Sequence, residues 1–303
     1  MLVADVIARP VDFERLGEDT VPVEKISVQN GGDAMNVAIG LAKLGRKTGF
    51  CGKVGDDMFG AFLRGVFEKH GVDTRGLKVS RETATSSCIA LVRENGQRMF
   101  LYSAGANNFF GADDVDDALI GECSHLHISG VNGMARLDAG DAARILRRAR
   151  EMGKTTSMDV TWDNQNRWLS VVESALPWLD FFMPSEAEAA LITGESDPVK
   201  MAEFLRGKGV KTAIVKLGEK GVYADGGGTE RFHLPAFNVP VVDTTGAGDS
   251  FTAGFLAKHT QGASLRECAR YASAVAAHCV GAVGATAGIP DAETVEEFLI
   301  DNF

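Results

Sequence analysis

The sequence predicts an α/β fold: a three-layer α/β/α sandwich with a mostly parallel central sheet and a small β-strand lid. Short apolar runs alternate with stretches of helical period over most of the 303 residues. Two segments interrupt this alternation with the pattern of antiparallel strands. Near the carboxyl end, a Gly-rich turn lies between an apolar run and a helix. We expect one domain over residues 1–303.

The apolar runs have the length of buried strands, and helical stretches separate them. Strands are predicted at residues 125–129, 155–160, 180–183 and 212–217. Helices are predicted at residues 33–44, 58–69, 137–152, 186–192, 198–208, 249–259, 265–279 and 291–300. Strands that alternate with helices usually pair in parallel and are covered on both faces. The 45% of hydrophobic residues is enough for such a core.

Two segments do not fit a parallel sheet. Residues 11–29 have little helical period, and residues 86–102 form a predicted hairpin with its turn at Glu94-Asn95-Gly96-Gln97. We expect these two segments to build a separate β layer. A β layer next to a crevice can act as a lid over a bound molecule.

Charge and cysteine content narrow the choice of partners. The formal net charge of −10 disfavours nucleic acid and anionic membrane surfaces as partners. A phosphate site in this chain must use backbone dipoles, metal ions or a few basic side chains. The five cysteines form no C-x-x-C pair, which is typical of reduced thiols in a cytoplasmic protein. We find no signal peptide and no membrane span in the sequence.

The Gly-rich turn is the most informative segment. A predicted strand at residues 237–242 leads into it, and a helix follows. Small residues at Gly246, Ala247 and Gly248 let backbone N–H groups approach an anion, and the helix dipole favours negative charge there. Asp249 lies in the first helical turn. It is either a common helix-start acid or a base that takes the proton of an attacking hydroxyl.

Two other phosphate-binding motifs are excluded. The G-x-x-x-x-G-K-[ST] loop is absent, and G-x-G-x-x-G fails because Phe251 occupies its last position. The turn also lies far downstream, whereas a dinucleotide-binding fold carries it after the first strand. A dinucleotide-dependent oxidoreductase is therefore disfavoured.

Two segments about 200 residues apart resemble the signatures of the ribokinase-like (PfkB) sugar kinases. Residues 243–251 (DTTGAGDSF) are similar to the carboxyl-terminal signature. Residues 31–38 (GGDAMNVA) and 52–57 (GKVGDD) are similar to the amino-terminal one. The resemblance covers essentially the whole chain. It implies a ribokinase-like fold and an ATP-dependent sugar kinase.

The resemblance also implies roles for individual residues. Asp249 matches the catalytic base, and Gly246, Ala247 and Gly248 match the anion hole. The matched sugar-binding residues are Asp5, Gly31, Gly32 and Asn36, and we expect Asn107 to help hold the sugar where the lid hairpin returns. Residues 216–221 (KLGEKG) and 278–288 are similar to the nucleotide-binding segments, which implies roles for Lys216, Gly218, Gly221, Ala282 and Gly284.

Metal ions enter through the same resemblance. The family carries Asn-x-x-Glu near Mg²⁺ and the phosphates, and this chain has Ser185 and Glu188 at those positions. Glu188 is expected to order Mg²⁺-bound water. Carbonyl groups around Asp243 and Thr245 are expected to hold a monovalent cation such as K⁺.

The first strand departs from the family pattern. Almost nothing precedes Asp5, where a full strand is expected. Either that strand is very short or the sequence is trimmed upstream, and we favour the second. For a chain that starts at Met1, we expect the sheet to lack one strand beside the sugar site.

Several alternatives stay open. A nucleoside kinase on the same fold needs an aromatic clamp, for which Phe13, Phe100 and Tyr102 are available in the lid. A non-catalytic sugar-binding regulator is a second alternative. His125 and His127 share one face of a strand and are expected to be structural rather than metal ligands. Open lid edges suggest a homodimer through the lid. The identity of the sugar is not predicted.

Overall fold

Parallel strands form the centre of the body, as the alternating pattern predicts. In the computed structural model, which describes residues 1–302, six strands pair in the order β12-β11-β10-β9-β8-β7. Strands β7 to β10 run parallel to one another. Strand β11 pairs antiparallel with β10 on one side and with β12 on the other. Their bounds are β7 His125–Val131, β8 Thr155–Val160, β9 Phe181–Phe182, β10 Thr212–Lys216, β11 Val222–Asp225 and β12 Arg231–Leu234. The four predicted strands are confirmed within a few residues.

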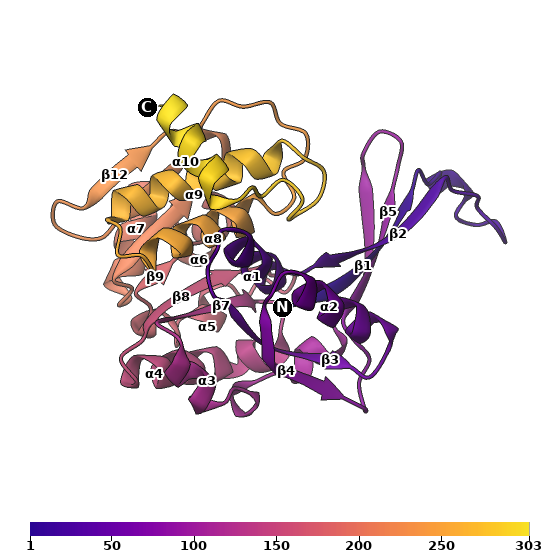
Figure 1. The fold of residues 1–303 in the computed structure, drawn as a ribbon, viewed down its shortest axis with the longest axis horizontal. Helices are drawn as coiled ribbons and strands as arrows, with labels where there is room; N and C mark the ends of the chain where they lie inside the picture. Colours follow the sequence, from indigo (N-terminus) through magenta and orange to yellow (C-terminus); the bar gives the residue numbers. More distant parts are fainter. Residues whose placement is uncertain (303) are drawn as a thin grey trace.

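Helices cover both faces of this sheet, which confirms the three-layer sandwich (Figure 1). One core lies between the sheet and α4 Ala142–Glu151, α5 Leu169–Val172 and α7 Pro198–Gly207. The other lies against α1 Asp33–Lys43, α8 Ala247–His259, α9 Leu265–Val280 and α10 Ala292–Asp301. The remaining α-helices are α2 Met58–Lys69, α3 Asp117–Glu122 and α6 Glu186–Thr193. Within residues 1–302, no helix has the length and apolarity needed to cross a membrane.

One helix starts later than predicted. The helical pattern of residues 137–152 resolves into a π-helical turn, Leu137–Asp141, followed by α4 from Ala142. Gly140 in that turn has φ +108°, which lies outside the helical region. The apolar spacing of the sequence continues through this kink, so periodicity alone did not reveal it.

The lid is a four-stranded sheet with the order β2-β1-β5-β6, and it projects from the body (Figure 1). Its strands are β1 Val3–Arg9, β2 Lys25–Gly31, β5 Ser87–Val92 and β6 Arg98–Ser103. The predicted hairpin of residues 86–102 is confirmed as β5 and β6.

The prediction for residues 11–29 was only partly correct. The lid strand there starts at Lys25, and the residues between β1 and β2 form a connection with one short 3₁₀ turn, Phe13–Arg15. The sequence analysis also missed β1, a full seven-residue strand. It pairs with β2 on one side and with β5 on the other, so it belongs to the lid rather than to the central sheet.

The predicted strand at residues 237–242 does not form. Within residues 1–302 this segment belongs to no ladder, and the Val241 and Val242 side chains are 63% and 60% exposed. Pro240 has no N–H to donate to a ladder. The Val242 N–H instead donates to the Val280 carbonyl at the end of α9 (2.7 Å).

The body sheet is interrupted on its β7 side. Among the described residues, 1–302, strands β3 Gly49–Gly55 and β4 Asp73–Ser80 pair only with each other, in a separate parallel sheet. β7 is the last strand of the six-stranded sheet. Within residues 1–302, no ladder joins β3 to β7.

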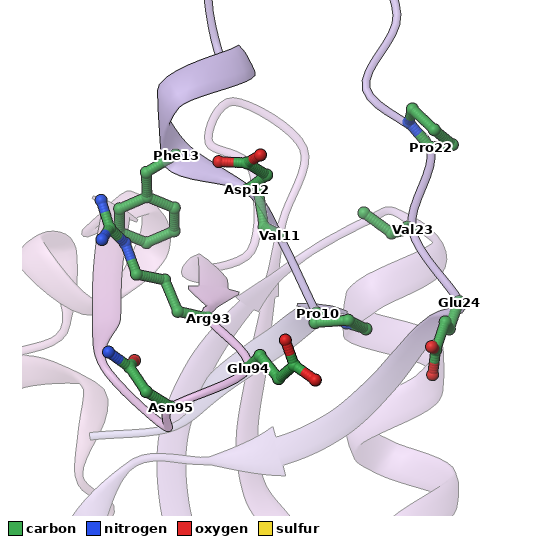
Figure 2. Close-up of a pocket in the computed structure, with 10 residues that line it drawn as sticks. All are labelled: Pro10, Val11, Asp12, Phe13, Pro22, Val23, Glu24, Arg93, Glu94 and Asn95. Atoms are coloured by element: carbon green, nitrogen blue, oxygen red, sulfur yellow. The ribbon is translucent and has the colours of Figure 1, made fainter.

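A hollow at the tip of the lid lies away from the residues of the sequence signatures. Figure 2 shows it between the connection after β1 and the β5–β6 turn. Its volume is about 870 Å³. The Arg93 guanidinium lies 4.3 Å from the centroid of the Phe13 ring. Arg93 is five residues beyond Cys88, the partner of Tyr102, or about 16 Å along a strand. Phe13 therefore does not join Tyr102 in an aromatic clamp.

Helices α1 and α8, which are far apart in the sequence, pack closely against each other. A Cβ added at Gly40 of α1 would lie 2.7 Å from the Ala253 Cβ of α8. Gly40→Leu should force these helices apart and lower the free energy of unfolding by about 1–3 kcal/mol. Gly65 of α2 has nothing within 4 Å of an added Cβ, so Gly65→Leu is the matched control. Urea denaturation of both variants tests this, and equal losses would contradict it.

Candidate active site

The Gly-rich turn delivers Asp249 to the start of α8. Gly246 precedes the helix at φ +77°, and a Cβ there would lie 2.4 Å from the Ala285 carbonyl oxygen. Only glycine fits this combination of a left-handed backbone and a close neighbour. The first N–H groups of α8 lack intrahelical acceptors and carry the positive end of the helix dipole. Ala247 and Gly248 therefore lie where the sequence placed an anion hole.

Asp249 is held by a residue from the other end of the chain. The Asn36 Nδ2 of α1 donates to Asp249 Oδ2 at 2.8 Å. Burial, and then the negative charge of Asp33, raise the pKa of Asp249 to about 8, and the Asn36 hydrogen bond opposes this rise. A carboxyl group with such a pKa is poised to exchange a proton near neutral pH.

The predicted sugar-binding residues lie on α1 and on the lid strands that precede it. Asp5 of β1 lies against Gly31 of β2, where an added Cβ would be 2.0 Å from Asp5 Oδ2. Burial raises the pKa of Asp5 to about 6. Gly32, at φ +89°, lets the chain pass the backbone of Met1, whose carbonyl oxygen would lie 2.8 Å from an added Cβ.

Asn107 does not have the predicted role. Its Nδ2 donates to the Leu2 carbonyl at 2.8 Å, and its Oδ1 accepts from the Leu2 N–H at 3.5 Å. The side chain is fully buried and is bonded to the Leu2 backbone, so it is not open to a ligand. Its position after the lid hairpin suggested that Asn107 lies near the start of the lid, and it does contact Leu2 there. The sequence does not show in which direction its amide group points.

Asp33 is a candidate site residue that the sequence analysis missed. Its Oδ1 pairs with the Met1 ammonium at 3.5 Å and accepts from the Ala34 N–H at 2.9 Å. Its Oδ2 is buried and has no hydrogen-bond partner among residues 1–302. Burial raises the pKa of Asp33. The only available signal was an acidic residue between two residues of the sugar-binding turn.

A buried polar cluster lies behind the turn. Lys216 Nζ, at the end of β10, donates to Asp159 Oδ2 at 2.9 Å, and Thr252 Oγ1 donates to the same oxygen at 3.1 Å. A Cβ added at Gly248 would lie 3.4 Å from Lys216 Nζ. Burial by itself lowers the pKa of Lys216, but the nearby carboxylates, Asp159 foremost, outweigh it and raise that pKa. The turn therefore has a fixed positive charge beside it.

Glu188 approaches this cluster from α6. The Ser185 N–H donates to Glu188 Oε2 at 2.8 Å, and the Glu188 N–H donates to Ser185 Oγ at 3.3 Å, which together form a capping box. Burial and the charge of Asp159 raise the pKa of Glu188. Carboxylate oxygens are the ligands that Mg²⁺ prefers, so Asp159 and Glu188 fit such an ion. Residues 1–302 contain no preassembled group of three metal-ligating side chains.

The predicted nucleotide-binding turns follow the ends of β10 and α9. Gly218 and Gly221 form a tight turn after Lys216, with φ +61° and +97°. The loop that contains Ala282 is tied to the anion-binding turn, because the Gly284 N–H donates to Asp243 Oδ2 at 3.1 Å. Thr245 donates to Asp243 Oδ1 through its N–H (3.0 Å) and its hydroxyl (2.7 Å).

An arginine of the lid reaches this turn and was not predicted. Arg98 of β6 donates to Thr245 Oγ1 at 3.0 Å and pairs with Asp243 at 3.5 Å. The residues are almost 150 positions apart, so no local pattern indicates the contact. These contacts tie the lid to the Gly-rich turn.

The two predicted structural histidines are confirmed as such. His125 hydrogen-bonds Thr155 at 2.8 Å and Ser157 at 2.7 Å, while His127 hydrogen-bonds Ser157 and Ser129, both at 2.7 Å. Burial lowers the pKa of His127 to about 3, so it remains neutral.

This arrangement defines a class of enzyme: a lidded α/β phosphotransferase with a carboxylate at an anion-binding helix start. The profile of the pfkB family carbohydrate kinases matches residues 1–292. The chain therefore belongs to the pfkB family of carbohydrate kinases, phosphotransferases that act on a sugar hydroxyl.

Comparisons with known proteins agree on the family but differ in the substrate. The chain is 31% identical over 279 residues to the 2-dehydro-3-deoxygluconokinase of Bacillus subtilis, covering 88% of this chain and 86% of that one. It is 31% identical over 298 residues to the aminoimidazole riboside kinase of Salmonella typhimurium, covering 93% and 92%. The ribokinase structure from Thermotoga maritima has a TM-score of 0.85 and 28% identity, covering 99% and 97%.

The raised pKa of Asp249 makes stability depend on pH. The folded value of about 8 exceeds the unfolded value of about 3.9, so the folded state binds more protons between them. The contribution of this raised pKa to the free energy of unfolding is fully present below pH ~4 and is lost as the pH rises towards 8. Asp249→Asn removes this loss, so its Tm relative to wild type should be higher at pH 8 than at pH 5. The same Tm difference at both pH values would contradict a raised pKa of Asp249 in the folded protein.

Proposed function

We propose that this protein transfers the γ-phosphoryl group of ATP to a hydroxyl of a small sugar, with Asp249 as the general base. The observation that carries the proposal is the Asn36–Asp249 hydrogen bond at the start of α8, with Lys216 beside the same turn. A carboxylate beside a bound phosphate is electrostatically unfavourable unless it takes a proton there.

The proposed reaction starts with the sugar between the lid and the body. Asp5 and Asp33 accept hydrogen bonds from sugar hydroxyls, and Asn36 orients Asp249. Asp249 takes the proton of the attacking hydroxyl as its oxygen bonds to the γ-phosphorus. The bond from that phosphorus to the bridging oxygen breaks, and ADP leaves with the electron pair. Backbone N–H groups of the turn and Lys216 stabilise the charge on the transferring group.

The residues present fit ATP and Mg²⁺. The turn at Gly218–Gly221 and the loop around Ala282 and Gly284 would hold the nucleotide, and Glu188 would hold Mg²⁺ through water. When bound, Mg²⁺ neutralises charge on the phosphate oxygens. Carbonyl groups near Asp243 and Thr245 remain the proposed K⁺ site. Lys43 already supplies a cation to the adjoining loop, donating to the Thr286 carbonyl at 3.0 Å.

A nucleoside kinase is the second candidate. Tyr102 shares the Asp5 face of the lid, because both residues are register partners of Cys88. An aromatic ring there could stack on a base, and one relative phosphorylates a riboside. A non-catalytic regulator is disfavoured because Asp249 and its anion-binding turn are both retained.

ATP turnover tests the base and the substrate class together. ADP release is measured with a panel of sugars, sugar acids, sugar phosphates and nucleosides. One class should stimulate turnover, and Asp249→Asn or Asp249→Ala should lower kcat by about 10²–10⁴ with folding retained. Asp56→Asn is the control, because Asp56 is exposed and pairs only weakly, with Arg81 at 3.7 Å. Wild-type turnover in the Asp249 variants would refute the assignment of the base.

We further propose that two copies associate through their lids. Register places Val28, Val6, Ile89 and Leu101 in one row across the lid, on the face opposite Asp5. The large apolar side chains exposed on this face are Ile26, Val28, Ile89, Met99 and Leu101. An exposed apolar sheet face of this kind typically marks an interaction surface.

Light scattering at micromolar concentration tests the lid dimer. The expected mass is twice the 32.2 kDa of one chain. Leu101→Lys should shift the mass to that of one chain, because it places a charge in the apolar row. Met58→Lys is the control, since Met58 is also an exposed apolar residue (77%) but lies on α2. A wild-type mass of one chain would rule the dimer out.

A further inference from the structure

An arginine on the outer part of the lid contacts the Gly-rich turn. Arg98 is the first residue of β6, and the lid projects from the body (Figure 1). Its Nη1 donates to Thr245 Oγ1 at 3.0 Å, and its Nη2 lies 3.5 Å from Asp243 Oδ1. Thr245 directly precedes Gly246, the residue at which α8 is capped. The contact therefore acts on the segment that sets the backbone of the proposed anion hole.

Asp243 restrains this segment through both of its carboxylate oxygens. Oδ1 accepts from the Thr245 N–H at 3.0 Å and from the Thr245 hydroxyl at 2.7 Å. Oδ2 accepts from the Gly284 N–H at 3.1 Å, which joins the turn to the loop after α9. Side-chain bonds of this kind fix the direction of backbone amides where a ladder does not. The turn therefore depends on where the Asp243 carboxylate is held.

Arg98 bonds to the groups that Asp243 and Thr245 leave free. The Thr245 hydroxyl gives its one hydrogen to Asp243, so its oxygen can still accept, and Arg98 supplies the donor. The guanidinium also places a positive charge beside the carboxylate. The Asp243 side chain is only 14% exposed, so solvent and salt screen this attraction less than they screen a fully exposed pair.

The position of the lid decides whether Arg98 makes this contact. The other end of β6 is tied to the base of the lid, where Ser86 Oγ donates to the Ser103 carbonyl at 3.1 Å. Arg98 lies five residues further out, or about 17 Å along the strand. A lid rotation of about 20° around that base would move Arg98 by about 6 Å, which is beyond hydrogen-bond reach.

Arg98 also lies on the side of the lid that carries Asp5. Side chains alternate along β6, so Arg98 and Tyr102 share one face. Tyr102 and Asp5 are both register partners of Cys88, which places Asp5 on that face too. A sugar held between Asp5 and the body would favour the lid position that Arg98 needs. Two contacts that require the same lid position strengthen each other.

We propose that Arg98 is a positioning residue that orders the Gly-rich turn, through Asp243 and Thr245, when the lid lies in the position seen in the structure. Sugar binding and the order of the anion-binding turn are thereby coupled through one side chain. Arg98 does not touch the reacting atoms. Its effect on catalysis rests on the proposed kinase function, whereas its effect on the turn does not.

Hydrogen exchange tests the effect on the turn without any substrate. The amides of Thr245 and Gly284 donate to Asp243 and report on its position. In Arg98→Met both should exchange at least about threefold faster than in wild type, and Arg98→Lys should recover part of the protection. Arg9→Met is the control, because Arg9 is exposed on the same lid face and its register partner is another cation, Lys25. Equal exchange in Arg98→Met and Arg9→Met would overturn the inference.

Kinetics with the acceptor that stimulates turnover test the effect on catalysis. Arg98→Met should lower kcat at least about fivefold, Arg98→Lys should regain part of it, and Arg9→Met should leave it unchanged. A higher KM for the sugar with an unchanged kcat would mean that Arg98 only holds the lid, and would overturn the positioning role. If no acceptor stimulates wild-type turnover, the kinase proposal fails, and the exchange rates alone decide whether Arg98 orders the turn.

Discussion

The packing of α1 against α8 is the constraint on which the site depends. α1 follows the lid strand β2, and α8 follows the Gly-rich turn more than 200 residues later. Close contact at Gly40 and Ala253 brings the first turns of both helices together. Asn36 then reaches Asp249 at 2.8 Å. The sugar side and the phosphate side of the site thus meet because two helices share one tight interface.

Electrostatics account for the proposed anion site in an acidic chain. The overall charge of −10 repels phosphate, so local groups must reverse the field. The start of α8 supplies a dipole, Lys216 supplies a buried cation, and Arg98 brings a second cation from the lid. Asp5, Asp33 and Asp249 gather where sugar hydroxyls would bind, and burial raises the pKa of all three.

The lid is both part of the site and a source of apolar surface. One face carries Asp5 and Tyr102 towards the body, and the other carries the exposed row that includes Ile89 and Leu101. The lid continues directly from the Met1–Leu2 segment, which Asn107 holds in place.

The sequence alone determined the alternating core and the identity of the Asp249 turn, because periodicity and small residues act locally. It predicted Asp5, Gly32 and Asn36 through resemblance, and the structure brings them together. It could not assign Val3–Arg9 to the lid, direct Asn107 inwards, or detect Asp33 and Arg98. Those outcomes depend on strand partners and on side-chain directions between distant segments. Only tertiary packing fixes them, because they depend on contacts between segments that are distant in the sequence, and no local pattern encodes such contacts.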